Sequence, residues 1–457
     1  MNERKRTMIF GGAALVLLLL ALVTAPGRVT PEAFLDQGEQ FFPEFTDPNE
    51  ATSLEVIDFD DETGEALPFK VVFKEGKYAI PSHNDYPADG KDRLAKTAAG
   101  VIDIKKDDFR TDNVTDHEFC GVIDPLDDAA TSLTGRGKRV TIKAENDKIL
   151  ADFIIGNEIE GRDKFRFVRV PGQKRVYAVR MDIDISTKFS DWIESDLLKV
   201  NKNDIRQVVL KDYSINERSG RVDQRDNVIL DKVDTDWQAN KMSANQEVDN
   251  TKMNNLLSAI DELSIVGVRP KPPGLSQSLS RADGGGIAMS QGDMLSLQSR
   301  GYYFTRDGQL LSNEGEIQTR TTDGVTYTLR FGEVVYGSGA DVSAGSESER
   351  DDQAGPGENR YLFITTEFDS TEFEKPAKPI NSDFLSKADS LWTNTDRRNK
   401  ELQDDYEEWE KKIEKGMSLS VDLNARFAGW YYVISSESFE KINLKRKDLV
   451  TAKEEES

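Results

Sequence analysis

The sequence has very few of the residues that build metal sites and disulfides. Among its 457 residues there is one cysteine, Cys120, and there are two histidines, His83 and His117. A single cysteine excludes any disulfide within the chain, and two histidines are too few for a multi-histidine metal site. A lone cysteine also agrees with an oxidising compartment, where unpaired thiols are rare. We therefore expect no metal and no cofactor.

Positive charge is scarce as well. The chain has 60 lysines and arginines against 83 aspartates and glutamates, which gives a formal net charge of −23 at pH 7. Nucleic-acid phosphates favour clustered basic residues, so we expect no nucleic-acid partner. Aromatic residues are sufficient for hydrophobic cores, with 22 Phe, 12 Tyr and 5 Trp. The length fits either two large domains or about three smaller ones.

The chain also lacks the short motifs of common enzymes. Neither the nucleophile motif G-x-S-x-G nor the phosphate-binding motif G-x-x-x-x-G-K-[ST] occurs. With 83 acidic residues, no pair of carboxylates can be singled out for glycoside hydrolysis. His83, in PSHNDYPAD, has no partner motif, and we interpret it as a loop histidine between a strand and a helix. We interpret Cys120, three residues after His117 and among apolar neighbours, as a small core residue. No catalytic residue is assigned.

One long apolar run is present, near the N-terminus. Residues 8–25 form 18 positions without charge, which as a helix would span about 27 Å, close to the thickness of a bilayer core. Arg4, Lys5 and Arg6 precede the run, and basic residues flanking a span stay in the cytoplasm. We therefore expect residues 1–30 to form a single-pass anchor in the inner membrane. The N-terminus is then cytoplasmic and the bulk of the chain is periplasmic.

A cleaved signal peptide is the alternative for this segment, since it also combines a basic start with an apolar run. Val23 and Ala25 supply small residues before a cleavage site. Pro26 would then follow the cut directly, which disfavours cleavage. We favour the uncleaved anchor, with membrane contact through residues 8–25.

The remainder of the chain repeats one succession of predicted elements. Each copy has an early strand, a strand with an aromatic residue, an aspartate before a helical pattern, a hairpin and two aromatic-rich strands. The strands fall at 53–59, 77–80, 140–142, 149–155, 165–170 and 176–179 in the first copy, and at 205–210, 236–239, 317–320, 325–331, 360–365 and 430–434 in the second. The sequence therefore predicts an α+β protein with two tandem homologous modules, 50–203 and 204–457, each a mainly antiparallel sheet with a packed helix.

The helical pattern of the second copy is the clearer one. Apolar residues recur at three- and four-residue spacing from Met253 to Leu263, which predicts a single apolar stripe lying on the sheet. Asp249 precedes the stripe and is placed to cap the first turn with its carboxylate.

Insertions distinguish the second copy, at about 333–360 and 366–428. The first is rich in Gly, Ser and Asp and predicts a mobile hairpin tip. The second carries a helical pattern with Leu402, Tyr406, Trp409 and Ile413 spaced by four, three and four. Such a helix either packs on its own module, which we favour, or presents a seam to a partner. The Pro- and Gly-rich stretch 270–286 predicts a loop or short linker.

Together these features resemble a bacterial family known as domain of unknown function 4340. The resemblance rests on the apolar run at 8–25, SLEVIDF at 53–59, YAIPSHNDYPAD at 78–89, WQANKMSANQEVD at 237–249, and GVIDP at 121–125 before a hairpin ending in glycine. It extends from about residue 50 to 450 and implies a membrane-tethered, extracytoplasmic protein. Some members of the family are associated with components similar to gliding-motility-type ABC transport systems. The family provides no catalytic residues to carry over.

We therefore expect a non-catalytic binding or scaffolding component of a bacterial envelope complex, with a protein partner that the resemblance connects to an ABC-type transport component. Two alternatives stay open. One is an envelope hydrolase that uses carboxylates in the cleft between the modules. The other is a glycan or small-ligand receptor, which an aromatic groove containing Trp237 or Trp430 would favour.

Overall fold

The computed structural model of the chain describes residues 14–17, 36–183, 185–216, 220–279, 290–305, 308–335 and 358–453. The predicted anchor at 8–25 lies outside these residues, apart from 14–17, and so does most of the hairpin tip predicted within 333–360. Within the described ranges, no helix is both long enough and apolar enough to cross a bilayer.

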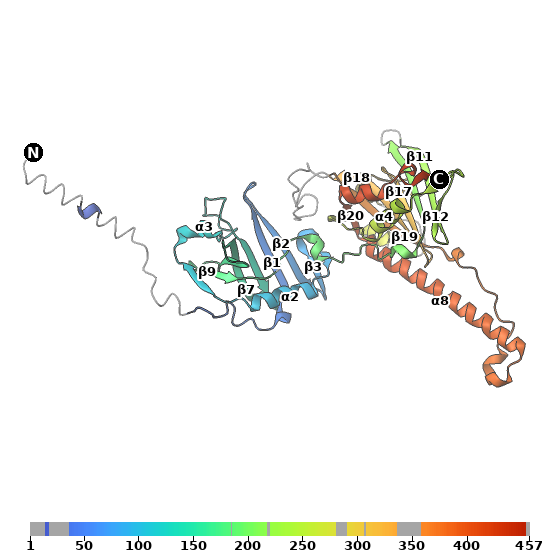
Figure 1. Cartoon of the computed structure of the whole chain (residues 1–457), viewed down its shortest axis with the longest axis horizontal. Helices are drawn as coiled ribbons and strands as arrows, with labels where there is room; N and C mark the ends of the chain where they lie inside the picture. Colours follow the sequence, from blue (N-terminus) through green and yellow to red (C-terminus); the bar gives the residue numbers. More distant parts are fainter. Residues whose placement is uncertain are drawn as a thin grey trace, which may run out of the picture. The chain divides into compact units, whose positions relative to one another are not determined.

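The described residues form an α+β fold in which the sheets are mostly antiparallel and helices are few (Figure 1). The chain divides into two compact units, which combine segments distant in sequence. One unit contains residues 1–51, 57–66 and 95–184, and the other contains 52–56, 67–94 and 185–457.

The first large sheet has nine strands in the order β4-β3-β2-β1-β6-β7-β8-β9-β5. Their bounds are β1 Ser53–Asp60, β2 Glu65–Lys74, β3 Lys77–Ile80, β4 Tyr86–Ala88, β5 Asp108–Thr111, β6 Lys138–Lys143, β7 Ile149–Glu158, β8 Phe165–Arg169 and β9 Val176–Arg180. Helix α2 (Lys91–Ile102) follows β4, and the single turn α3 (His117–Cys120) follows β5. In α2, Leu94, Ala98 and Val101 are buried at the spacing of one helix face.

The second large sheet has eight strands in the order β12-β11-β10-β17-β18-β19-β20-β14. Their bounds are β10 Ile205–Asn216, β11 Arg221–Val233, β12 Asp236–Ala239, β14 Gly267–Pro270, β17 Glu316–Thr321, β18 Val325–Val335, β19 Asn359–Phe368 and β20 Trp430–Ile434. Two short pairs accompany it, β13 (Gln246–Val248) with β21 (Val450–Ala452) and β15 (Tyr302–Phe304) with β16 (Leu310–Ser312). The helices are α4 Asn250–Asp261, α5 Pro273–Leu279, α6 Gln291–Gln298, α8 Asn394–Ala428, α9 Ser436–Ile442 and α10 Arg446–Leu449.

The predicted hairpins are present because their residues alternate between a buried and an open face. In the β6–β7 hairpin, Val140, Ile142 and Phe153 are fully buried. On the more open face, Arg139 Nη2 donates to Asp152 Oδ2 across the strand pair at 2.7 Å. Charged cross-strand pairs of this kind add to register specificity, whereas the apolar face determines which side meets the core.

Helix α4 confirms the predicted stripe and cap. The apolar residues from Met253 to Leu263 that form the stripe are buried, and α4 packs against β12 and α9. The Asp249 carboxylate accepts hydrogen bonds from the backbone N–H groups of Thr251 and Lys252, at 2.9 and 3.1 Å. These bonds satisfy two first-turn donors that have no partner within the helix.

One prediction about the 270–286 stretch was wrong. Residues 273–279, expected to be loop, form helix α5, while the residues from 280 onward lie outside the described part. Pro273 is the first residue of this helix, where the missing N–H has no helical partner to lose and the fixed φ suits the helix. Proline therefore begins the helix here.

His83 is a core residue of the fold. It ends a short 3₁₀ turn between β3 and β4 and is fully buried, with its ring stacked on Phe189 at a centroid distance of 4.2 Å. Nδ1 contacts Ser82 Oγ at 3.0 Å, whereas Nε2 has no hydrogen-bond partner among the described residues. Burial, followed by the nearby charge of Arg269, lowers the pKa of His83 to about 4.

The depressed pKa of His83 predicts acid sensitivity. Between pH 6.5 and about 4 the unfolded chain binds a proton at this ring and the folded chain does not, so the free energy of unfolding falls as the pH falls through that window. Wild type should lose on the order of 2–3 kcal/mol of unfolding free energy across this window. We expect His83→Phe, which keeps the stacked ring, to abolish this loss. Urea unfolding of both proteins from pH 8 to pH 4 measures it. A constant difference between wild type and variant across this range would contradict the prediction.

A buried lysine joins β14 to the end of α8. Lys271 Nζ donates to the carbonyl oxygen of Phe427 at 3.0 Å, and the Lys271 backbone N–H donates to Gly429 at 2.8 Å. The ammonium lies 3.9 Å from the ring centroid of Phe363 and 5.5 Å from that of Tyr431. A cation suits a helix C-terminus and an aromatic face, but burial lowers the pKa of Lys271 well below its usual value.

The lowered pKa of Lys271 predicts that the free energy of unfolding depends on pH in the alkaline range. Its lowered folded-state pKa means that the stability it contributes is complete above the unfolded value of about 10.5 and is lost as the pH falls below that value. We expect Lys271→Met to gain stability relative to wild type as the pH is lowered from 10.5, by at most about 1.4 kcal/mol per pH unit. Chemical unfolding of both proteins between pH 7 and pH 10.5 tests this. A pH-independent difference would show that the lysine titrates normally.

Candidate functional site

The most distinctive surface feature of the described chain is a projecting arm. We define the arm as residues 369–415, which leave the end of β19 and return through the N-terminal part of α8 (Figure 1). Helix α8 has 35 residues and is therefore about 52 Å long. Its buried residues from Gly416 onward are Gly416, Ser420, Leu423, Phe427 and Ala428. Only the C-terminal part of the helix packs on β18 and β19.

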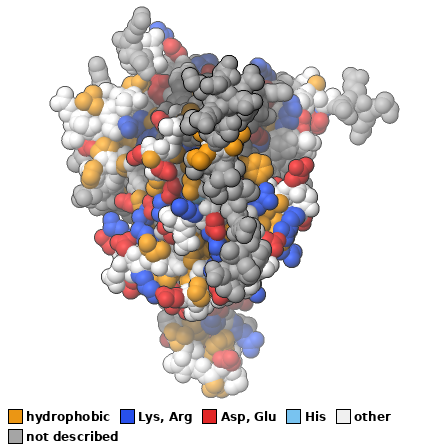
Figure 2. All heavy atoms as spheres, turned by 90° about the vertical axis from the view of Figure 1, so that its left-hand side faces the viewer, with side chains coloured by type: hydrophobic (Ala, Val, Ile, Leu, Met, Phe, Trp, Pro, Cys, Tyr) orange, Lys and Arg blue, Asp and Glu red, His pale blue; other side chains and the backbone are white. Residues whose placement is uncertain are grey.

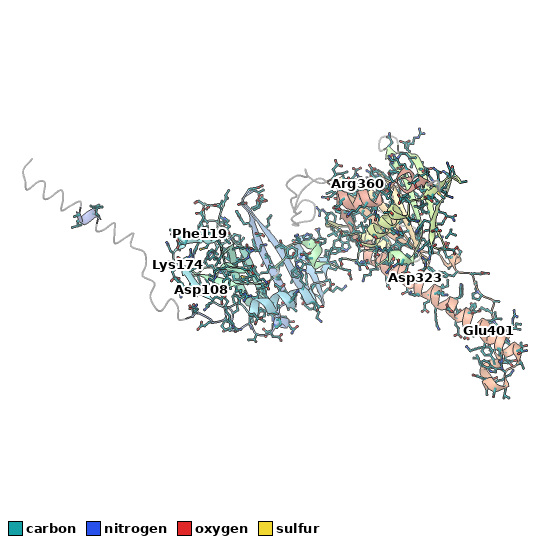
Figure 3. The ribbon with its side chains drawn as sticks, viewed as in Figure 1. Asp108, Phe119, Lys174, Asp323, Arg360 and Glu401 are labelled. Atoms are coloured by element: carbon teal, nitrogen blue, oxygen red, sulfur yellow. The ribbon has the colours of Figure 1, made fainter. Side chains whose placement is uncertain are left out.

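Gly416 is the residue at which α8 meets the sheet. A Cβ atom at this position would lie 2.3 Å from Cε2 of Phe368 and 2.5 Å from the carbonyl oxygen of Asp323. Only glycine allows this approach without displacement of its neighbours. Lys415 Nζ pairs with the Asp323 carboxylate at 2.9 Å beside it. Asp323 lies at the sheet, whereas Glu401 lies toward the far end of the arm (Figure 3).

The inner face of the arm carries the apolar stripe found in the sequence. Tyr406 and Trp409 contact each other, with ring centroids 5.4 Å apart, and both are half-buried. They pack against the segment that runs out along the helix: Trp409 Nε1 donates to the carbonyl oxygen of Phe373 at 3.3 Å, and the Lys375 ammonium lies 5.0 Å from the Trp409 ring centroid. The stripe is therefore covered by the arm segment that precedes α8, and the C-terminal part of the same helix packs on its own module, which is the packing we favour from the sequence.

The outer surface of the arm changes charge along its length. We define the shaft as residues 401–415, which contain seven acidic residues and three lysines. Glu401, Asp405 and Glu408 lie at spacings of four and three, on one exposed face of the helix. Elsewhere, on the face seen in Figure 2, acidic and basic side chains lie interspersed. The shaft thus concentrates the negative charge that is otherwise spread over the chain.

A second candidate is a groove beside edge strand β5, with a volume of about 640 Å³. Phe119 is 69% exposed at this groove, and its ring centroid lies 6.5 Å from that of Phe167. The Arg162 guanidinium pairs with Asp108 at 2.5 Å. Asp108 and Phe119 both belong to this region of the first sheet (Figure 3). An exposed aromatic ring among charged side chains can stack on a small ligand.

The residues considered from sequence do not form a catalytic group. His117 Nε2 bonds to the carbonyl oxygen of Lys174 at 2.8 Å. Cys120 is buried in a cluster with Val122 and Ile154, and burial raises the pKa of its thiol. This agrees with a core cysteine, because a reactive thiol needs a lowered pKa and access to solvent. Over the described ranges, no group of three or more His, Cys, Asp or Glu residues could hold a metal ion.

The tryptophans proposed for a receptor groove have other surroundings. Trp237 is buried in β12. Trp430, at the start of β20, makes an edge contact with Tyr86 at a centroid distance of 5.0 Å. The most exposed phenylalanine among the described residues is Phe119, which sequence reasoning treated only as an apolar neighbour of Cys120. Phe119 lies within the one-turn helix α3, which is too short to show an apolar periodicity that would indicate exposure or burial.

The close approach at Gly416 gives a prediction about the arm. Gly416→Ala introduces a methyl group against Phe368 and the Asp323 backbone, which we expect to cost about 1–3 kcal/mol despite the better helix propensity of alanine. Gly292→Ala in α6 is the matched control, because its Cβ would meet only Ser290 Oγ, at 3.6 Å. Thermal unfolding and hydrogen exchange of the α8 amides measure both variants. Equal effects of the two substitutions would contradict the steric argument.

The comparisons with known proteins concern the middle of the chain. No curated protein and no solved structure has a significant match to it. Residues 79–278 match one protein family, and this segment begins in β3 and ends in α5, so it includes strands of both large sheets. The resemblance noted in the sequence is thereby confirmed. Over residues 79–278, the chain matches the model of the family described as domain of unknown function (DUF4340).

Proposed function

We propose that this protein is a non-catalytic binding or scaffolding component of a bacterial envelope complex. In this proposal residues 8–25 anchor it in the inner membrane with the N-terminus in the cytoplasm, and the bulk of the chain is extracytoplasmic. The basic residues before the apolar run support this orientation. The resemblance to the family suggests an ABC-type transport component as the protein partner.

The arm is the observation that carries the binding role. Ordering two segments away from the sheet costs conformational entropy and leaves most of their surface in water. Only the contacts between these two segments offset that cost. The residues that dock α8 begin at Gly416, so the preceding turns contribute no packing to the sheet. A projection of this kind is therefore better explained by binding to a partner than by the stability of the fold.

The similar strand orders of the two large sheets support the scaffolding role. Read in chain order, β1, β2 and β3 correspond to β10, β11 and β12, and β6 to β9 correspond to β17 to β20. With these correspondences, and with β5 matched to β14, the first sheet without its edge strand β4 has the order β3-β2-β1-β6-β7-β8-β9-β5, which becomes β12-β11-β10-β17-β18-β19-β20-β14. Two tandem homologous modules, 50–203 and 204–457, explain this agreement most simply, and the arm is then an insertion that only the second module has.

The shaft indicates the chemistry of the protein partner. Its seven acidic residues against three lysines would attract a basic surface, and charge complementarity mainly increases the association rate and the specificity. Glu401 and Asp405 are exposed, and Glu408 keeps a 67% exposed side chain while it pairs with Lys412. These three carboxylates form the face that we assign to the partner.

Crosslinking in membranes tests this function. A photo-reactive residue at Gln403 in the full chain is expected to capture a recurrent protein partner, and the triple variant Glu401→Lys, Asp405→Lys and Glu408→Lys is expected to lower the yield about tenfold. Charge reversal of Asp61, Glu75 and Glu145, which are also exposed but distant in sequence, serves as the control and should leave the yield unchanged. Absence of any recurrent partner, or equal losses in both triple variants, would refute the proposal.

A further inference from the structure

The far end of the arm exposes three aliphatic side chains. We define the tip as residues 376–400, in which Ile380 is 86% exposed, Leu385 is 73% exposed and Leu391 is 71% exposed. These are the highest values among the large hydrophobic side chains that the structure describes. Single exposed hydrophobic residues are common, but three at the end of one projection form a feature that requires a partner.

The exposed residues lie on a backbone that is tied by hydrogen bonds to buried or half-buried side chains of the tip. The buried Asn399 side chain accepts from the Ile380 backbone N–H at 3.1 Å and donates to Asn381 Oδ1 at 3.1 Å. Trp392 Nε1 donates to the carbonyl oxygen of Phe384 at 3.2 Å, and Phe384 is itself buried. These bonds orient the backbone on either side of the exposed residues.

An internal ion pair adds to these contacts. Lys387 Nζ pairs with the buried Asp396 carboxylate at 2.9 Å, which lowers the pKa of Asp396 to about 2. Asp396 also completes a capping box with Thr393 at the start of α8. The negative charge of Asp396 is therefore neutralised by Lys387 within the tip.

The tip is positively charged although the chain as a whole is strongly acidic. It contains five lysines and arginines against three aspartates; Lys387 pairs with Asp396, and Lys400 pairs with Asp404 of the shaft. Arg397 and Arg398 are exposed, and neither guanidinium forms an ion pair with any residue that the structure describes. Both lie near the N-terminus of α8, where a cation opposes the helix dipole, so helix stability does not explain them.

We propose that the tip binds the surface of an anionic lipid bilayer. Ile380, Leu385 and Leu391 insert between the headgroups, and Arg397 and Arg398 pair with lipid phosphates. Charge complementarity supports an anionic surface. A fluid bilayer accepts separate protruding side chains without a matching pocket, whereas a protein partner would need one for each. Trp392, half-buried beside these residues, is of the type enriched at membrane interfaces.

This inference goes beyond the proposed function, which concerns the acidic shaft and a protein partner. It is also independent of the anchor at 8–25, because the tip lies in a different part of the chain. The two contacts are compatible along the arm: the shaft repels an anionic surface and the tip attracts one, so the arm would meet a bilayer end-on.

A site-specific probe tests the tip in the full chain. Leu385→Cys, labelled with a polarity-sensitive fluorophore, is mixed with phosphatidylcholine vesicles that do or do not contain phosphatidylglycerol. Cys120 is buried and leaves the label selective. Ile149→Cys, 58% exposed in the β6–β7 hairpin, carries the control label. With anionic vesicles we expect a blue shift and quenching by brominated lipid at position 385 and neither at position 149.

Two further variants separate the apolar and electrostatic contributions. Ile380→Ser with Leu391→Ser should raise the lipid concentration for half-maximal quenching about tenfold or more, and Arg397→Gln with Arg398→Gln should do the same and remove the preference for phosphatidylglycerol. These exposed substitutions should leave the thermal unfolding midpoint unchanged. Equal quenching at positions 385 and 149, or none at 385, would overturn the proposal. Because no partner protein is present, such a failure leaves the scaffolding function untouched.

Discussion

The contact between Gly416 and the sheet is the constraint on which the arm depends. Because the Phe368 ring and the Asp323 carbonyl occupy the space of a side chain, α8 lies directly against the strands at this point. The docked part then continues to Phe427 and Gly429, whose carbonyl oxygens Lys271 binds. A helix held at both ends of its docked segment has a defined direction, and its remaining turns must project along the same axis. The arm therefore projects from the sheet along the axis of α8 (Figure 1).

Much of the fold could be predicted from local patterns. The β6–β7 hairpin and the stripe of α4 follow from periods of two and 3.6 residues, which depend only on the neighbouring sequence. His83 shows where this reasoning ends, because the ring that buries it belongs to Phe189, more than a hundred positions later. The prediction at Pro273 failed for a different reason. Proline breaks a helix in its interior, but Pro273 is the first residue of α5, where proline is favoured.

The candidate site could be predicted from the sequence less completely than the fold. The spacing of Leu402, Tyr406, Trp409 and Ile413 predicted a helix with one apolar face, and that helix is present. Spacing does not say what covers such a face, and the covering segment around Phe373 and Lys375 has no periodic pattern of its own. The capping box of Thr393 and Asp396 was a readable signal for the start of α8. The exposure of Ile380 and Leu385 was not, because an aliphatic residue in a polar segment is as consistent with a core position.

The charged residues of α8 are arranged differently in its projecting part and in its docked part. Stability alone would place acidic residues in its first turns and basic residues further along, since the helix dipole favours that order. Arg397 and Arg398 near the start, followed by the acidic shaft, reverse it over most of the projecting part, while Asp396 alone keeps the favourable arrangement through its buried bonds. A cation near a helix N-terminus costs some tenths of a kcal/mol, and this cost applies to Arg397 and Arg398 but not to the shaft, because the dipole acts mainly on the first and last turns. The docked part of α8 shows no comparable segregation, so the order of charges belongs to the surface that the arm presents, and the binding proposed for the shaft and the tip accounts for it.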